Sequence, residues 1–509
     1  MTSACKVALL YAKSQTVRGR AANAYAEEDT TKGEYSRDEI YPPLGILTLA
    51  AVLEERGGYD VRILDDCIQP LDEIKDGMAW ADVVGISSLT PNASRARELG
   101  LIAKNEIGRF VVMGGPHPTT NPEYFLNAGA ADICVQGEGD RTLPEILEHY
   151  TDRSTWRDIA GMTFKDGDEI VENPRRELVS DVNELPFPAY HLGDMERYFA
   201  GMVTPGINIM TSRGCPFSCT FCDANMTPRQ YRAMKPERAV DLIESLLRTY
   251  NPPQIFFFDD LFTIQRKRVV SICKEIVNRG LHFEWSCESR VDTVDAEMLR
   301  WMRKAGCVKI YFGLESGSPN MLQTMKKDVT PEKIQAGAKL TREIGIFFKF
   351  FILYGFPNDT VEDHRLTEQL VANCRPDAIS VSILVPIPGT EIFEEIKPHL
   401  LVDVTEREFH FWHHDEFWKH PTFTHDEMVA ERDRLIQSHA KVVKTPLYRL
   451  GRRLERMWAV ARNPALFTDY FEIRKRKSQH NARVKQGGWN EPRKGAVDLQ
   501  IPSASWLGK

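Results

Sequence analysis

Residues 209–223 read Ile209-Met-Thr-Ser-Arg-Gly-Cys-Pro-Phe-Ser-Cys-Thr-Phe-Cys-Asp223 and place Cys215, Cys219 and Cys222 in a Cx3Cx2C spacing. The apolar start of this stretch predicts a strand at Ile207–Thr211, so the cysteines lie in a loop that leaves the end of that strand. Thiolates are the usual protein ligands of iron–sulfur clusters, and three of them in one loop can hold three irons of a [4Fe–4S] cube. We therefore predict that these three cysteines bind a [4Fe–4S] cluster.

A zinc site or three buried thiols are the alternatives to a cluster. Zinc sites normally use four ligands in two separated pairs, and nothing near the loop supplies a second pair. Because no fourth cysteine lies nearby, one iron of a cube would keep an open position, as reactive metal sites do. Arg213 and Gly214 lie at the start of the loop, and Phe217 and Phe221 can shield the cluster from water.

Composition limits the class of protein. The 509 residues are 42% apolar and 27% charged, as in a folded globular protein, and the net charge of −7 says little about partners. Ten cysteines are too few for a disulfide scaffold in a chain of this length. The apolar run at the N-terminus is too short for a signal peptide, and no run approaches a membrane span. We therefore expect a cytoplasmic protein.

A series of βα units follows the cysteine loop. Apolar, β-branched runs alternate with amphipathic stretches, which predicts a partial parallel (β/α)6 barrel with its ligands at the C-terminal ends of the strands. The predicted strands are Ile207–Thr211, Gln254–Phe258, Phe283–Cys287, Val308–Phe312, Phe347–Leu353 and Ala378–Leu384. The predicted helices include Pro236–Thr249, Arg266–Asn278, Ala296–Lys304 and Pro331–Ile344.

The first 150 residues also alternate between strands and helices, which predicts a Rossmann-like (flavodoxin-like) α/β domain with a parallel sheet covered on both faces. Its strands are expected at Val7–Ala12, Asp60–Leu64, Asp82–Ile86, Phe110–Met113 and Ala131–Val135, with helices at Gly45–Glu55 and Ala93–Ile107. Glycine-rich turns at 114–120 and 137–142 follow the last two strands. They let backbone approach a ligand, and the second leads into a helix whose N-terminus favours anions. Tight turns without a ligand remain the alternative.

These patterns divide the chain into residues 1–150, a linker at 151–200 with a hairpin at Met162–Val171, a barrel at 201–400 and a mainly helical region at 401–509. Phe409–His425 is dense in aromatic and histidine residues and can cap the barrel or pack between domains. The spacing of His410, His413 and His414 does not single out a metal site.

The cysteine loop at the end of the first barrel strand resembles that of the radical S-adenosylmethionine (SAM) superfamily. The resemblance implies that the amino and carboxylate groups of SAM chelate the open iron, and that one electron from the cluster releases a 5′-deoxyadenosyl radical. It also implies that the ends of the next strands bind SAM. The residues at these ends are Asp259, Asp260, Arg290, Glu315 and Ser316, and the later turns Gly355–Thr360 and Pro386–Thr390 would border the adenine. Any one of these could instead be an ordinary ion-paired strand end.

From about residue 5 to 400 the chain resembles the radical SAM subgroup with an N-terminal cobalamin-binding domain. The resemblance implies that two turns lie beside the corrin or at the neighbouring strand end. Their residues are Gly114, Gly115, His117, Thr119, Gly137, Glu138 and Gly139. The Asp-x-His-x-x-Gly motif that supplies a cobalt ligand in other cobalamin proteins is absent, so no histidine is expected on cobalt, and a domain that has lost cobalamin stays possible.

Methylthiotransferases are a competing resemblance, because they carry three further cluster cysteines in their first domain. Cys5, Cys67 and Cys134 are the candidates here. A parallel sheet would put Cys5 and Cys67 at opposite edges, so we expect separate, buried apolar thiols instead.

With both cofactors, the most economical reaction is methylation of an unactivated carbon of a small-molecule or lipid-like substrate. A one-electron reductant of the flavodoxin or ferredoxin type would supply electrons. Cobalamin-dependent oxidation or ring closure, as in the anaerobic Mg-protoporphyrin monomethyl ester cyclase, and a cobalamin sensor without turnover are the alternatives.

The C-terminal region bears on partners. From Lys441 to Lys509 the chain holds 16 Lys or Arg against five Asp or Glu. Apolar side chains at Leu447, Leu450, Leu454, Met457, Trp458 and Ala461 share one helical face, with Arg449, Arg452, Arg453 and Arg456 elsewhere. We expect a helix that packs through its apolar face and leaves its basic side in water. Attachment to an anionic membrane is the alternative, and no nucleic acid partner is expected, since no RNA-binding module accompanies the basic residues.

Overall fold

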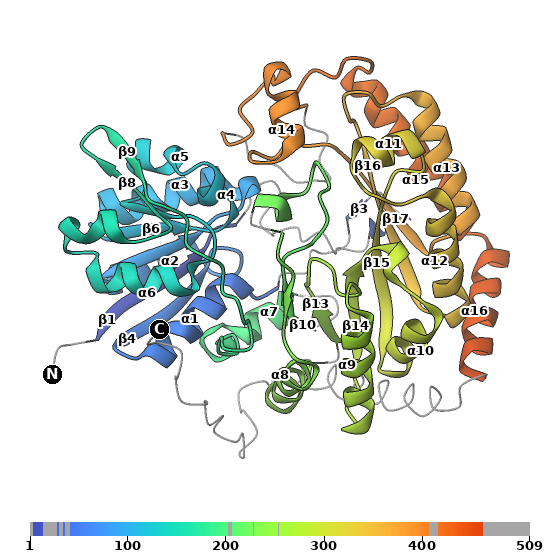
Figure 1. The fold of residues 1–509 in the computed structure, drawn as a ribbon, viewed down its shortest axis with the longest axis horizontal. Helices are drawn as coiled ribbons and strands as arrows, with labels where there is room; N and C mark the ends of the chain where they lie inside the picture. Colours follow the sequence, from blue (N-terminus) through green and yellow to red (C-terminus); the bar gives the residue numbers. More distant parts are fainter. Residues whose placement is uncertain are drawn as a thin grey trace.

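The computed structural model describes residues 4–13, 28–29, 34–35, 41–201, 206–226, 229–252, 254–406 and 416–461. Two α/β units lie side by side, with the segment that carries the cysteine loop between them (Figure 1). The first contains a seven-stranded sheet of order β4-β1-β5-β6-β7-β8-β9, and the second a six-stranded sheet of order β10-β13-β14-β15-β16-β17. Both predicted α/β architectures are therefore confirmed.

Five parallel strands form the centre of the first unit. They are β1 (Cys5–Tyr11), β4 (Tyr59–Asp65), β5 (Val83–Ser87), β6 (Phe110–Gly114) and β7 (Ile133–Val135). The helices are α1 (Leu44–Arg56), α2 (Leu71–Trp80), α3 (Ala93–Leu101), α4 (Pro116–Thr120), α5 (Glu123–Asn127) and α6 (Gly139–His149). Since β1 pairs with β4 on one side and β5 on the other, the strand order reverses between β1 and β5. Such a switch point is the usual place for a ligand.

The hairpin expected in the linker belongs to this sheet. Its strands β8 (Met162–Asp166) and β9 (Glu169–Glu172) extend the sheet antiparallel to β7. Its buried Phe164 packs on Trp156, and the pairing covers the backbone edge that β7 would otherwise expose. Sequence periodicity shows a hairpin but not the strand with which it pairs.

The second unit is an open barrel of six parallel strands. They are β10 (Gly206–Ile209), β13 (Gln254–Phe257), β14 (Glu284–Ser289), β15 (Cys307–Glu315), β16 (Phe347–Tyr354) and β17 (Ala378–Ile383). Its helices are α8 (Pro236–Thr249), α9 (Arg266–Asn278), α10 (Ala296–Lys304), α11 (Pro319–Thr324), α12 (Pro331–Ile344) and α13 (Val361–Cys374). Buried aromatic rings, including Phe257, Trp285 and Phe348, fill the core. All six strand predictions are confirmed.

Local signals explain why several helix boundaries are predictable. Thr330 caps α12 by accepting a hydrogen bond from the Lys333 amide, and Pro331 opens the helix. Gly345 then ends it in the left-handed conformation at φ +80°. The cap, the proline and the glycine are all local in sequence.

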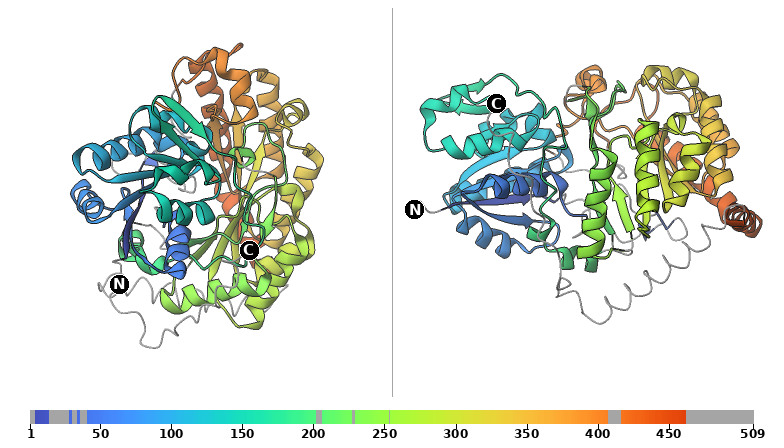
Figure 2. Two further views of the ribbon diagram at one scale, coloured as in Figure 1. Left: turned by 60° about the vertical axis from the view of Figure 1, so that its left-hand side comes forward. Right: turned by 60° about the horizontal axis from the view of Figure 1, so that its bottom comes forward.

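The region after β17 completes the barrel. Helix α14 (Glu391–Ile396) lies in the connection, and α15 (His425–Val443) packs against β17 and α13. Helix α16 (Pro446–Ala461) lies on the outer flank of the barrel, away from the first sheet (Figure 2). The histidines His410, His413 and His414 lie outside the described residues, as does the tail beyond Ala461.

The prediction that α16 packs through its apolar face is wrong. Leu447 is 81% exposed and Met457 65% exposed, whereas Arg452 is only 4% exposed. A basic side chain is buried here because Arg452 pairs with Asp377, a residue that periodicity alone does not connect to it. Within the described ranges, no helix is long and apolar enough to span a bilayer.

The three cysteines of the first unit lie apart, as expected. Cys5 opens β1 and Cys134 lies inside β7, while Cys67 follows the far end of β4. Cys134 is fully buried, whereas Cys5 and Cys67 are half-buried. They do not form the second cluster site of a methylthiotransferase.

Candidate active site

The cysteine loop is closed at its base by a short antiparallel pair. Strand β11 (Ser212–Arg213) pairs with β12 (Arg232–Ala233), so residues 214–231 form a loop with fixed ends. Gly214 has φ +80°, and a Cβ there would lie 2.4 Å from the Gln230 carbonyl oxygen. Only glycine fits this position without movement of the backbone.

The three thiols of the loop are close enough for the charges of Cys215 and Cys219 to raise the pKa of Cys222. Burial is the larger cause, and it raises the pKa of all three thiols. Within the described part of the chain, no three Cys, His, Asp or Glu side chains converge on one metal ion. A cube does not need such convergence, since each cysteine binds a different iron. The donor set therefore fits a cube better than a single ion.

Asp259 was expected to face SAM, but its carboxylate is used elsewhere. It is fully buried and accepts hydrogen bonds from the amide and hydroxyl of Thr211 and from the Ser212 amide. Arg268, also buried, donates to the Thr211 carbonyl and hydroxyl oxygens. We therefore regard Asp259 as a residue that holds the start of the loop. Asp260 accepts a hydrogen bond from the Gly214 amide at 3.0 Å, so it holds the loop directly before Cys215.

Arg290 reaches the loop from the end of β14. Its guanidinium lies 3.9 Å from the centre of the Phe217 ring and pairs with both oxygens of Asp292. Nη2 also donates to the Lys327 carbonyl. Nη1 is buried and has no hydrogen-bond partner among the described residues. A buried donor without a partner is costly, so a carboxylate ligand beside Phe217 would satisfy it.

Glu315 pairs with a lysine that the sequence did not reveal. The Lys327 ammonium lies 2.7 Å from the Glu315 carboxylate, and both side chains are nearly buried. A Cβ on Gly313 would lie 2.4 Å from the Glu315 carboxylate and 2.8 Å from the Lys327 ammonium, so this glycine makes room for the pair. Glu315 has φ +63°, a strained conformation for glutamate that is typical of functional sites. The charge of Lys327 also acts on Cys219, which places the pair beside the loop.

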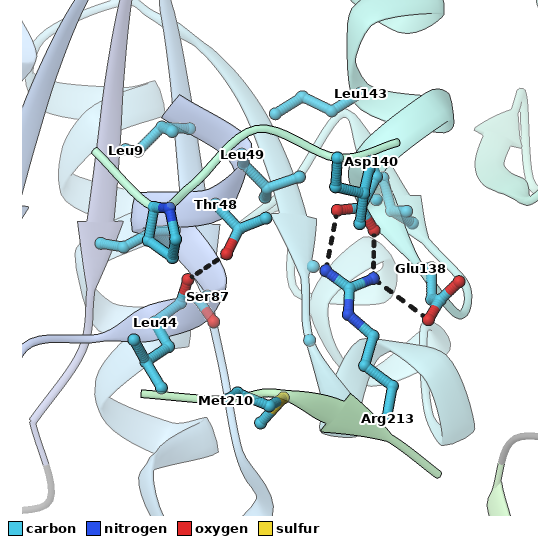
Figure 3. Close-up of a pocket in the computed structure, with 18 of the residues that line it drawn as sticks. Leu9, Leu44, Thr48, Leu49, Ser87, Glu138, Asp140, Leu143, Met210 and Arg213 are labelled. Carbon is cyan, nitrogen blue, oxygen red and sulfur yellow. Dashed lines mark hydrogen bonds and ion pairs between the residues drawn. The ribbon is translucent and has the colours of Figure 1, made fainter. Parts of the chain in front are cut away.

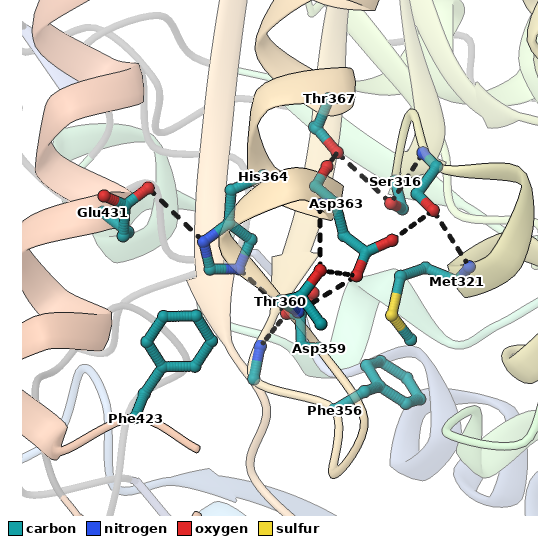
Figure 4. A network of polar contacts seen from close by, with 12 residues as sticks. Ser316, Met321, Phe356, Asp359, Thr360, Asp363, His364, Thr367, Phe423 and Glu431 are labelled. Carbon is teal, nitrogen blue, oxygen red and sulfur yellow. Dashed lines mark hydrogen bonds and ion pairs between the residues drawn. The ribbon is translucent and has the colours of Figure 1, made fainter.

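Ser316 begins a polar network that reaches the last barrel helix (Figure 4). Its hydroxyl contacts Thr367 of α13 at 3.2 Å and accepts a hydrogen bond from the Ser318 amide. Ser318 donates to Asp363 of α13, whose carboxylate also accepts hydrogen bonds from Thr360, the N-cap of that helix.

The far end of this network is a buried histidine. His364 Nε2 lies 3.0 Å from Asp359, and Nδ1 lies 3.5 Å from Glu431 of α15. Asp359 in turn accepts from the Gly355 amide. The turns after β15 and β16 are therefore fixed relative to α15.

A cavity of about 320 Å³ lies at the switch point of the first sheet (Figure 3). Five of the predicted cobalamin residues line it: Gly114, Gly115, Gly137, Glu138 and Gly139. Apolar side chains, such as Leu9 of β1 and Leu49 of α1, line it, and so do Met210 to Arg213 of the second unit. The cavity is therefore mainly apolar, and both units contribute to it.

Models of known protein families match both α/β units of the chain. The model of the radical SAM superfamily matches residues 209–371, and that of the B12 binding domain matches residues 36–147. The chain is 33% identical over 376 residues to the uncharacterized methyltransferase PH0819 of Pyrococcus horikoshii, with 72% of this chain and 81% of that protein covered. The chain belongs to the B12-binding radical SAM family.

Two further proteins resemble this chain, one in sequence over part of its own length and one in fold. The anaerobic magnesium-protoporphyrin IX monomethyl ester cyclase of Cereibacter sphaeroides is 29% identical, and the match covers 71% of this chain but only 61% of the cyclase. The radical SAM methyltransferase TsrM of Kitasatospora setae, solved with cobalamin and a [4Fe–4S] cluster, has a TM-score of 0.67 at 19% identity. The match covers 85% of this chain and 91% of TsrM, which shows that the two proteins share a fold.

Membership of the radical SAM family confirms the predicted cofactors. The radical SAM domain implies the [4Fe–4S] cluster and SAM, and the B12 binding domain implies cobalamin. The roles of individual side chains remain proposals.

Two predicted cobalamin residues of this family member do not line the cavity. His117 is fully buried between Tyr124 and Phe125, and its Nδ1 lies 3.2 Å from the Thr90 hydroxyl. Burial lowers the pKa of His117 to about 4. Thr119 links the two glycine turns, since its hydroxyl donates to the Gly115 carbonyl and accepts from the Gly137 amide. His117 and Thr119 therefore support the glycine turns without lining the cavity.

An ion cluster joins the B12-binding and radical SAM units beside the cavity. Arg213, two residues before Cys215, pairs with both oxygens of Asp140 at 2.8 and 3.0 Å and with Glu138 at 3.2 Å. Arg232 pairs with the other oxygen of Glu138 at 2.9 Å. The helix N-terminus that was expected to attract a ligand anion therefore already carries two carboxylates, which bind the base of the cluster loop.

We expect Arg213→Ala to destabilise the interface by about 2–3 kcal/mol, because it leaves the buried Asp140 carboxylate without its cation and Glu138 with Arg232 alone. The measurement is the free energy or midpoint of the first unfolding transition in urea. Arg157→Ala is the control, since its ion pair with Asp166 is exposed on both sides and should contribute less than about 1 kcal/mol. Equal effects of the two substitutions would contradict a stabilising interface.

Proposed function

We propose that the protein is a cobalamin-dependent radical SAM methyltransferase that methylates an unactivated carbon of a small-molecule or lipid-like substrate. The observation that carries the proposal is the position of the cavity. Met210 to Arg213 line it, and the cluster loop begins at the next residue. The switch-point cavity and the three cysteines are therefore adjacent, as a reaction that uses both cofactors requires.

The residues described above would divide the binding of the cofactors. Cys215, Cys219 and Cys222 would hold the cluster, and Arg290 would bind the carboxylate of SAM through its free Nη1. Glu315 and Ser316 would receive the ribose hydroxyls, with Lys327 holding the Glu315 carboxylate in place.

The switch-point cavity would hold the nucleotide tail of cobalamin, since its apolar walls suit an aromatic base and its glycines allow close approach. His117 does not line the cavity, and no histidine would then bind cobalt from this turn.

When bound, the cofactors supply the radical and the methyl group, while the protein orients the groups and excludes water. The net reaction consumes one substrate C–H bond, two molecules of SAM and two electrons. One SAM is cleaved to methionine and 5′-deoxyadenosine, which receives the substrate hydrogen. The other SAM gives its methyl group to the carbon and leaves as S-adenosylhomocysteine. A flavodoxin- or ferredoxin-type partner would deliver the electrons, and attachment to a membrane, the alternative raised by the C-terminal sequence, would suit a lipid-like substrate.

The experiment is anaerobic turnover with SAM carrying a deuterated methyl group, after reconstitution with iron, sulfide and cobalamin. Extracts of isoprenoid lipids and of tetrapyrroles serve as substrate pools. We expect 5′-deoxyadenosine and S-adenosylhomocysteine in similar amounts and a product heavier by one labelled methyl group. Formation of 5′-deoxyadenosine with an unlabelled product would instead support oxidation or ring closure, the activity named for the Cereibacter relative. Absence of 5′-deoxyadenosine under reducing conditions would contradict both and leave a sensor.

A further inference from the structure

Helix α16 is attached to the barrel through its polar side. Arg452 pairs with both oxygens of Asp377 at 2.7 and 2.5 Å. The Tyr448 hydroxyl donates to the Pro376 carbonyl at 2.9 Å, and Glu455 pairs with Arg342 of α12 at 3.0 Å. These contacts fix which side of the helix faces the protein.

The opposite side is an exposed apolar stripe. Leu447, Leu450, Leu454 and Met457 are 81%, 54%, 46% and 65% exposed. Their spacing of three and four residues puts them on one helical face. Helix α16 lies on the outer flank of the barrel and forms the edge of the molecule in Figure 1 and in the right-hand view of Figure 2. Four large apolar side chains together are an unusual surface for water alone.

Basic side chains flank this stripe. Arg449 and Arg453 are exposed, and at 100° per residue they fall between the attached side and the apolar stripe. Lys441, at the end of α15, is exposed too. The helix thus presents an apolar stripe bordered by arginines, the arrangement of helices that lie in a membrane interface. Arginine stems can lie along the acyl boundary while the guanidinium groups reach lipid phosphates.

Charge favours a lipid surface over a protein occupant. Two antiparallel copies packed stripe to stripe would bring the Arg449 and Arg453 side chains of both copies together, and like charges oppose such a contact. The sequence of the segment 462–509 contains ten Lys or Arg against four Asp or Glu, which is a net positive charge. An anionic bilayer complements both the apolar stripe and the basic residues around it.

We propose that α16 docks the protein on the surface of an anionic lipid bilayer, with Leu447, Leu450, Leu454 and Met457 inserted at the headgroup boundary and Arg449 and Arg453 bound to lipid phosphates. The docking does not depend on the reaction catalysed. It would hold the enzyme at the membrane without a spanning segment.

The test is co-sedimentation of the full chain with phosphatidylcholine vesicles that contain 0 or about 30% phosphatidylglycerol, at low and high salt. We expect binding only to the anionic vesicles, and weaker binding at high salt. The variant Leu447→Ser/Leu450→Ser/Leu454→Ser should bind at least about tenfold more weakly, because three apolar insertions are lost. Arg449→Gln/Arg453→Gln should lose most of the dependence on phosphatidylglycerol and on salt.

Two controls separate docking from general stickiness. Leu401→Ser removes an apolar side chain that is 52% exposed elsewhere, and Val361→Ser one that is 42% exposed on α13, and neither should change binding. Thermal unfolding should be unchanged in the α16 variants, since the replaced side chains face away from the barrel. Failure of the wild-type chain to bind, equal binding by the triple-serine variant, or a dimer that this variant converts to a monomer would each overturn the proposal.

Discussion

Replacing Cys215, Cys219 and Cys222 together with alanine is expected to remove the [4Fe–4S] cluster and to lower 5′-deoxyadenosine formation by at least about a thousandfold. The loop holds its three cysteines within eight residues at the end of β10, whereas the other seven are single positions in the sequence, and Cys273, Cys287 and Cys307 are buried in the barrel core. Without thiolate ligands, the protein has no means of holding a cube that delivers an electron to SAM. The measurements are iron and sulfide content, the electron paramagnetic resonance spectrum of the reduced protein, and chromatography of SAM products.

Cys5→Ala is the matched control, since Cys5 is a half-buried thiol of the first sheet and should leave the cluster intact. Single alanine variants of the three loop cysteines should lose most of the cluster. A triple variant that still shows an intact cube after anaerobic reconstitution would refute the assignment of the loop, and with it the proposed reaction.

The second large effect is expected from Gly114→Leu, which should weaken cobalamin binding by at least about a hundredfold, or about 2.7 kcal/mol. Gly114 lines the switch-point cavity together with Val112, two residues earlier on the same face of β6. A Cβ at this position would lie 3.9 Å from Val135, an ordinary contact, so a side chain can enter the cavity without displacing the backbone. The leucine would then occupy space that the cofactor needs.

Cobalamin retained after anaerobic gel filtration, read from its visible absorption, measures this effect. Methyl transfer should disappear, while the cluster and slow cleavage of SAM without methylation should persist. Ala128→Leu places the same side chain on the surface and should change nothing. Normal cobalamin retention by a folded Gly114→Leu variant would show that the cofactor does not use the cavity. Gly115 is a less suitable position for this test. Its φ is +102°, and a Cβ there would lie 2.7 Å from the Ser88 carbonyl oxygen, so a substitution would strain the backbone.

The local sequence determined the strands, the helices and the cluster loop. The buried parallel strands are short continuous apolar runs, burial in a helix repeats every three to four residues, and caps such as Thr330 and Gly345 lie next to the turns that they end. Helices α8, α9, α10 and α12 therefore have the predicted bounds. The three cysteines of the loop are likewise recognisable because the loop alone brings them together.

Only the tertiary structure decided which side chains meet across long separations. Asp259 bonds to Thr211, 48 residues away, and Arg213 reaches Asp140 over 73 residues, so neither partner is visible in a local pattern. The pair of Glu315 and Lys327 has room only because Gly313 carries no side chain, and these three residues meet only in the folded barrel. The orientation of α16 was decided in the same way. Periodicity defines an apolar face but not whether that face is buried, and the buried pair of Arg452 with Asp377 turned it outward.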